Sequence, residues 1–110
     1  MLTLASKNKI FICHQPVNLR KSFDGLSEIV EEHFQEDVTG GAYFVFINRV
    51  RDLMKILYFD GDGLAIWAKR LEKGSFGQCK HKIPVIDRRD FLMLLEGVEP
   101  RRMQKRFKSI

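Results

Sequence analysis

Apolar residues gather in the middle of the chain, where three runs alternate with polar turns. The runs are Ala42 to Asn48, Leu53 to Phe59 and Leu64 to Ala68, and all three are rich in β-branched and aromatic residues, as strands are. Asp60-Gly-Asp-Gly63 separates the second run from the third. Because glycine adopts a positive φ at low cost, this sequence is typical of a hairpin turn. The pattern therefore predicts a three-stranded antiparallel meander.

The first run is apolar on both faces of the expected strand, from Ala42 to Ile47. Tyr43, Val45 and Ile47 would point to one face, and Ala42, Phe44 and Phe46 to the other. A strand with two apolar faces is either covered on both sides or turned toward an interface. We therefore expect this strand either to be central in the sheet and covered on both faces or to face an interface.

A strand and an amphipathic helix are expected before the meander. The segment from Lys9 to His14 is short and apolar, and Pro16 ends it. Three- and four-residue spacings then predict one buried helical face. Gly25 weakens the first turn, so we expect the helix to begin nearer Ser22 than Asn18. The residues of the expected buried face are Leu19, Phe23, Leu26, Ile29, Val30, His33 and Phe34.

The segment after the meander predicts a loop, a strand and a short helix. The loop begins at Lys69, and the strand would run from Lys80 to Ile86. Asp87 is a good N-cap for an apolar helix that Gly97 stops. We expect a single α+β domain over residues 1–99, with an antiparallel sheet, followed by a basic and flexible tail over residues 100–110.

Composition excludes several classes of protein. The 110 residues suffice for one core, and no apolar run approaches the roughly 20 residues of a membrane span. Two distant cysteines, Cys13 and Cys79, and no recognisable secretory signal favour a reducing, cytoplasmic setting. No phosphate-binding glycine loop and no nucleophile with an assignable base is present. We expect no catalysis, no cofactor, no small-molecule substrate and no membrane partner.

Two candidate metal sites have simpler explanations. Asp60 and Asp62 would need a bidentate glutamate at the twelfth place of a calcium loop, and Leu71 stands there. Their proximity fits a turn. Cys13-His14 and Cys79-x-His81 lack the closely spaced ligand pairs of structural zinc sites. We expect no metal.

Positive charge is segregated along the chain. The formal net charge is +5, and the segment from Asp24 to Asp37 holds six acids and no lysine or arginine. Basic residues instead follow the first and third runs, whose ends lie at the same end of a meander. This arrangement predicts a basic rim that contacts phosphate, with a merely solvated rim and a protein-docking rim as alternatives. The candidate nucleic-acid contacts are Arg49, Arg51, Lys55, Lys69, Arg70 and Lys73, with Arg101, Arg102, Lys105 and Arg106 in the tail.

Five blocks stand out along nearly the whole chain: Val17 to Leu26, Gly41 to Arg49, Lys55 to Gly63, Lys69 to Phe76 and Leu94 to Glu99. Together and in this order they resemble the TnpB-type accessory proteins of the insertion sequence 66 family, which are distinct from the RNA-guided nucleases of the same label. Val50 departs from the family pattern, which commonly has arginine there, and Phe59 stands where the family often has tryptophan.

The resemblance implies a process more than a mechanism. It implies a bacterial, cytoplasmic and non-catalytic factor that assists DNA transposition beside a separate transposase. DNA, the transposase and other accessory proteins of the same element are the expected partners. The alternative is a protein–protein adaptor of the transposition complex that makes no direct contact with DNA.

Overall fold

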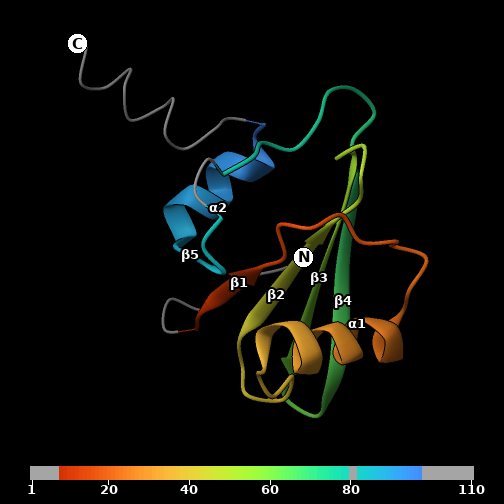
Figure 1. Cartoon of the computed structure of the whole chain (residues 1–110), viewed down its shortest axis with the longest axis vertical. Coiled ribbons are helices and arrows are strands. Elements are labelled where there is room, and N and C mark those ends of the chain that lie inside the picture. The colour runs from red at the N-terminus through yellow and green to blue at the C-terminus, as the bar shows by residue number, and fades with distance from the viewer. Residues whose placement is uncertain (1–7, 80–81, 98–110) are drawn as a thin grey trace.

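A computed structural model describes residues 8–79 and 82–97, and its centre is a five-stranded sheet of order β4-β3-β2-β1-β5 (Figure 1). Helices lie on both faces of this sheet. The elements are β1 (Ile10–Ile12), α1 (Phe23–Ile29), the π-helical turn η1 (Val30–Phe34), β2 (Tyr43–Ile47), β3 (Leu53–Asp60), β4 (Gly63–Arg70), β5 (Val85–Ile86) and α2 (Arg88–Leu95).

The predicted meander is confirmed. β2 pairs with β3 and β3 with β4, both antiparallel, and Asp60 lies opposite Gly63 at the hairpin. Gly61 has a φ of 69°, which fits the first position of a two-residue type II′ turn. The expectation that the chain leaves the sheet at Lys69 was wrong. The pairing of β4 with β3 continues to Arg70, because its partner Leu53 is the first residue of β3.

The sheet is mostly antiparallel, with one parallel pair that the sequence did not predict. β1 runs parallel to β2, because α1 and η1 carry the chain back across the sheet between them. β5 pairs with the other edge of β1 in the antiparallel sense. The strand expected from Lys80 to Ile86 is shorter than predicted, and Lys80 and His81 lie outside the described residues.

The predicted helix before the meander is confirmed from Phe23 onward, with Ser22 at its N-cap. Three members of the expected buried face differ. Leu19 is buried but precedes the helix, whereas Phe23 and His33 are exposed. The periodicity extended beyond the true start because Leu19 is buried, although the rest of residues 18–22 is polar and exposed. Gln35, in the left-handed conformation with a φ of 55°, ends η1.

The second helix follows its sequence signals. The side chain of Asp87 accepts a hydrogen bond of 2.8 Å from the backbone N–H of Asp90, as an N-cap residue does. Phe91 and Leu94 are buried against the sheet. Gly97 follows the helix with a φ of 79°.

Two apolar clusters cover the two faces of β2, all of whose residues are buried. Val45 and Ile47 pack with Met54 and Phe91 on the α2 side. On the opposite face Phe44 and Phe46 belong to a cluster that includes Leu26. The prediction of a central strand covered on both faces is confirmed. The turns at the two ends of the meander lie outside both clusters.

No helix among residues 8–79 and 82–97 is long and apolar enough to cross a membrane. The predicted basic tail over residues 100–110, including Arg101, Arg102, Lys105 and Arg106, lies outside the described residues.

Candidate nucleic-acid interface

The turn between β2 and β3 is built around the side chain of Asn48. Its Oδ1 accepts hydrogen bonds of 3.1 Å from the backbone N–H groups of Asp52 and Leu53, and its Nδ2 donates to the Asp52 carboxylate at 2.7 Å. The backbone N–H of Arg51 donates to the Asn48 carbonyl at 3.1 Å. These bonds fix the turn, so the exposed side chain of Arg49 projects from a rigid support.

The loop after β4 is bonded directly to this turn. The Leu71 N–H donates to the carbonyl of Asp52 at 2.7 Å, and the Phe76 N–H donates to the carbonyl of Arg51 at 2.8 Å. Phe76 itself is 1% exposed and belongs to the core. The expectation that the two loops emerge at the same end of the sheet is confirmed. Residues 48–52 and 69–75 together form a surface that we call the basic rim.

The guanidinium of Arg51 points into the protein, so Arg51 stabilises the rim instead of extending from it into solvent. Nε donates to the Phe76 carbonyl at 3.2 Å, and Nη2 donates to the carbonyl of Gly77. Burial lowers the pKa of Arg51 from its ordinary value. Arg51 also holds a left-handed backbone conformation, with a φ of 62°. Its side chain therefore joins the two loops.

The other basic residues of the rim are exposed to solvent. Arg49, Lys69 and Lys73 are all exposed, and they come from the turn, the end of β4 and the following loop respectively. Arg70 is also exposed, but its Nη1 lies 3.8 Å from the carboxylate of Asp52. A solvated pair of this kind contributes little to stability and is weakened by salt.

The structure does not bring Lys55 into this group. Lys55 lies within β3, opposite Phe46 and Ala68, and its Nζ donates to the backbone carbonyl of Lys21 at 3.3 Å. It therefore connects the sheet to the segment before α1. The sequence grouped it with the rim because it stands near Arg51 along the chain.

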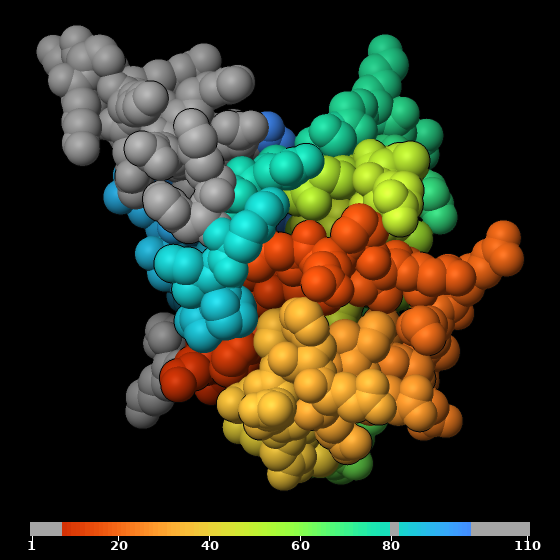
Figure 2. Space-filling view, in the orientation of Figure 1, coloured from red at the N-terminus to blue at the C-terminus, as the bar shows by residue number. Residues whose placement is uncertain are grey.

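Charge is separated in space as well as in sequence. Figure 2 shows the β2–β3 turn and the loop after β4 adjoining at one end of the molecule, with α1 and η1 toward the other end. The exposed acids of this helical segment are Asp24, Glu28, Glu31 and Glu32. The rim itself contains Asp52 and Glu72, so its positive character comes from the surplus of bases.

The candidate metal ligands have ordinary roles where they are described. Asp60 and Asp62 flank Gly61 in the hairpin turn. The Sγ of buried Cys13 donates to the Gln15 carbonyl at 3.5 Å, and burial raises the pKa of this thiol. Residues 8–79 and 82–97 contain no cluster of three His, Cys, Asp or Glu side chains suited to a metal ion.

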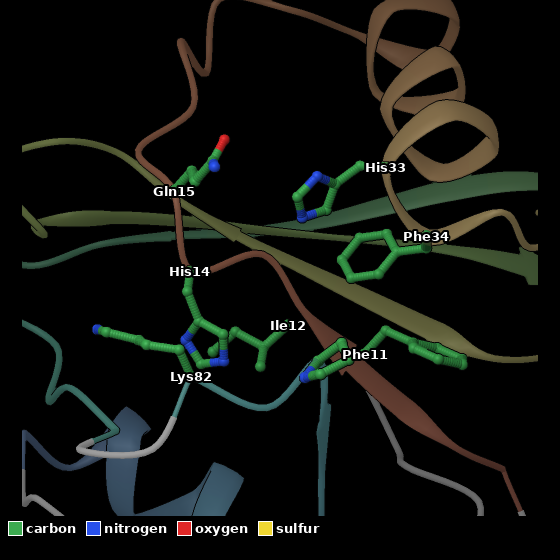
Figure 3. A pocket seen from close by; sticks show the side chains of 8 residues that line it. Phe11, Ile12, His14, Gln15, His33, Phe34 and Lys82 are labelled. Atoms are coloured by element: carbon green, nitrogen blue, oxygen red, sulfur yellow. The ribbon is translucent and has the colours of Figure 1, made fainter.

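A groove of about 530 Å³ was missed by the sequence analysis. Figure 3 shows the rings of His14 and His33 on opposite sides of it, with Lys82 beside His14. Phe11 and Phe34 supply apolar wall. These residues come from β1, η1 and the segment before β5, and no local pattern joins them.

The groove is an electropositive environment. His14 Nε2 donates to the carbonyl of Ile83 at 2.6 Å, since a carbonyl can only accept. Burial lowers the pKa of His14, and the nearby positive charges of Lys82, Arg51 and His33 lower it further, against the hydrogen bond to Ile83. A carboxylate or phosphate entering the groove would meet complementary charge.

Comparison with known proteins agrees with the sequence blocks described above. Residues 8–105 match the family described as IS66 Orf2 like protein. The uncharacterized protein y4jC of Sinorhizobium fredii (strain NBRC 101917 / NGR234) is 28% identical over 100 residues, covering 89% of this chain and 86% of the relative. The uncharacterized protein y4hO of the same strain is 30% identical over 76 residues, covering 69% and 66%.

No solved structure matches the chain significantly. The family match covers nearly all of the described fold, including both loops of the basic rim. The match connects the chain to transposition of insertion sequences in an accessory role, and does not itself assign a contact to any residue. The chain belongs to the IS66 Orf2-like family of insertion-sequence accessory proteins.

Proposed function

We propose that this chain is a non-catalytic transposition factor that contacts DNA phosphates through the basic rim, in the bacterial cytoplasm and beside the transposase. This proposal is supported mainly by the hydrogen bonds that join the two loops. They hold the exposed residues Arg49, Lys69 and Lys73 at one edge of the fold. Because hydrogen bonds already fix the two loops, binding a polyanion would order the basic side chains but not the backbone that carries them.

The contacts are of the kind that gives affinity without base readout. Lysine and arginine side chains on phosphate oxygens position a protein on a duplex but do not discriminate sequence. Arg70 adds charge to the rim once its pair with Asp52 opens. We also propose that the four basic residues of the tail, Arg101, Arg102, Lys105 and Arg106, add non-specific affinity.

The test compares two triple variants with the same loss of charge. The rim variant carries Arg49→Ala, Lys69→Ala and Lys73→Ala, and the control carries Lys9→Ala, Arg20→Ala and Lys21→Ala, all at exposed positions. Affinity for element-end and random duplexes is measured by fluorescence anisotropy at low salt. We expect the rim variant to bind at least about tenfold more weakly than the control. Equal affinities of the two variants would refute the rim as the DNA contact.

A second function, as a protein–protein adaptor, is favoured by the groove between His14 and His33. Its apolar wall and positive charge suit a partner segment that carries both apolar and acidic side chains. The test is co-purification with the transposase after nuclease treatment. His14→Glu together with His33→Glu should abolish co-purification if the groove is the contact, whereas the rim variant should leave it intact. If the groove variant still co-purifies with the transposase, the groove is not the contact.

A further inference from the structure

β4 is an edge strand along its whole length. In the part of the chain that the structure describes, it pairs with β3 on one side and with no strand on the other. An unpaired edge of eight residues is long enough to accept another strand. The opposite edge of the sheet is β5, which has two residues and is therefore a poor template.

The hydrogen bonds of the sheet show which backbone groups face outward. The Leu71 N–H donates to Asp52, the residue directly opposite, and this pattern repeats at every second residue of an antiparallel pair. Ala65, Trp67 and Lys69 therefore direct their N–H and C=O groups toward β3. The groups that point away from the sheet belong to Leu64, Ile66, Ala68 and Arg70.

The side chains of β4 lack the usual protection of an edge. Natural edge strands carry proline, central charges or bulges that prevent pairing. Here the residues from Leu64 to Ala68 are all apolar, and the charges stand at the ends. Asp62 lies in the turn just before the strand, and Lys69 and Arg70 are the last two residues of the strand.

We propose that β4 pairs with β4 of a second copy of this chain, in the antiparallel sense and centred on Ile66. Only outward-facing residues can form the hydrogen-bonded pairs, which restricts the register to steps of two residues. Centring on Ile66 places Leu64 opposite Ala68 of the second copy, and Asp62 opposite Arg70 of the second copy. The charged ends of the strands then complement each other at both ends of the interface.

This arrangement closes on itself. The twofold axis passes through the Ile66 pair perpendicular to the sheet, so the two sheets of five strands join into one of ten. Both copies keep α1 on the same face. Ala65 lies opposite Trp67 of the second copy on the other face, where Trp67 is half-buried in the single chain. The new outer edges are the two short β5 strands.

The first test removes one outward donor without changing the core. Ala68 is exposed and its N–H points away from β3, so Ala68→Pro leaves the β3–β4 ladder complete while blocking the second copy. Ala68→Ser keeps the N–H and is the matched control. Sedimentation equilibrium without DNA should give twice the mass of one chain for the natural protein and Ala68→Ser, and the single-chain mass for Ala68→Pro.

The second test uses charge exchange to check the register of the pairing between the two β4 strands. Asp62→Arg alone and Arg70→Asp alone should each weaken dimerisation by about tenfold or more, because like charges then face each other. The double variant should restore it. Asp62 follows Gly61 in the turn and has no positive φ, so the hairpin tolerates the change.

Three results would overturn the proposal: a single-chain mass for the natural protein at high concentration, a dimer that survives Ala68→Pro, or no rescue in the charge-exchanged double variant. A dimer with unchanged mass in all variants would assign the association to another surface. Because these measurements contain no DNA, their outcome is independent of the proposed DNA contact.

Discussion

At the scale of single residues, Arg49 and Arg51 show how neighbours of one type separate into different roles. Arg49 is exposed, whereas the guanidinium of Arg51 donates to two backbone carbonyls of the Phe76–Gly77 segment. Both residues are bases in one polar turn, so the sequence supplied no reason to distinguish them. Arg51 has a left-handed backbone conformation within the turn that the Asn48 side chain closes, and its side chain bonds inward.

We expect Arg51→Ala to lower the free energy of unfolding by roughly 1–3 kcal/mol, because two carbonyls lose a charged donor. Arg49→Ala should leave it within about 0.5 kcal/mol, as exposed substitutions usually do. Urea titration of both variants measures the difference. Equal stability of the two variants would contradict the structural role assigned to Arg51.

The lowered pKa of His14 predicts a specific pH dependence. In the unfolded chain the histidine has its ordinary pKa of 6.5, and in the folded chain the value is lower. The unfolded state therefore binds more protons as the pH falls below 6.5, and stability decreases in that direction. Stability from this group is fully present above 6.5.

Replacing His14 by glutamine should flatten this part of the pH profile. Thermal melts of the natural protein and the variant, recorded from neutral to mildly acidic pH, give the comparison. Arg20→Gln, at an exposed position outside the groove, is the control. A natural protein that becomes more stable on acidification through this range, with the effect removed by His14→Gln, would reverse the assigned sign.

At the scale of helices and strands, the sequence was sufficient to predict features that depend on only a few neighbouring residues. The Asp-Gly hairpin, the N-cap at Asp87 and the stop at Gly97 all appear as predicted, because turn and cap chemistry act over a few residues. The parallel pairing of β1 with β2 was not predictable in this way, since it depends on how α1 crosses the sheet. The extension of β4 to Arg70 likewise depends on Leu53, far away in sequence.

The cap of α2 gives a direct test of this local reasoning. Asp87→Ala should cost about 0.5–2 kcal/mol of unfolding free energy, because the Asp90 N–H loses its acceptor. Asp87→Asn keeps a side-chain oxygen and should cost much less. Chemical denaturation of both variants is the measurement, and an equal loss in the two would show that the charge of Asp87 matters more than its capping oxygen.

At the scale of the whole molecule, the fold converts a scattered set of bases into one supported rim. The sequence placed Arg49, Lys69 and Lys73 at the correct end of the meander, since strand direction alternates in a hairpin. It could not show that Lys55 faces the α1 side, or that His14, His33 and Lys82 line a common groove. These juxtapositions arise from long-range packing.

The salt dependence of DNA binding measures how many phosphates the basic rim contacts. Each phosphate contact contributes a slope of about −0.9 to a plot of log affinity against log salt concentration for duplex DNA. The rim variant, lacking Arg49, Lys69 and Lys73, should therefore lose about 2–3 units of slope relative to the natural protein, and the equally charged control variant should lose much less. Identical slopes for the two variants would show that the basic rim does not contact the phosphates of DNA.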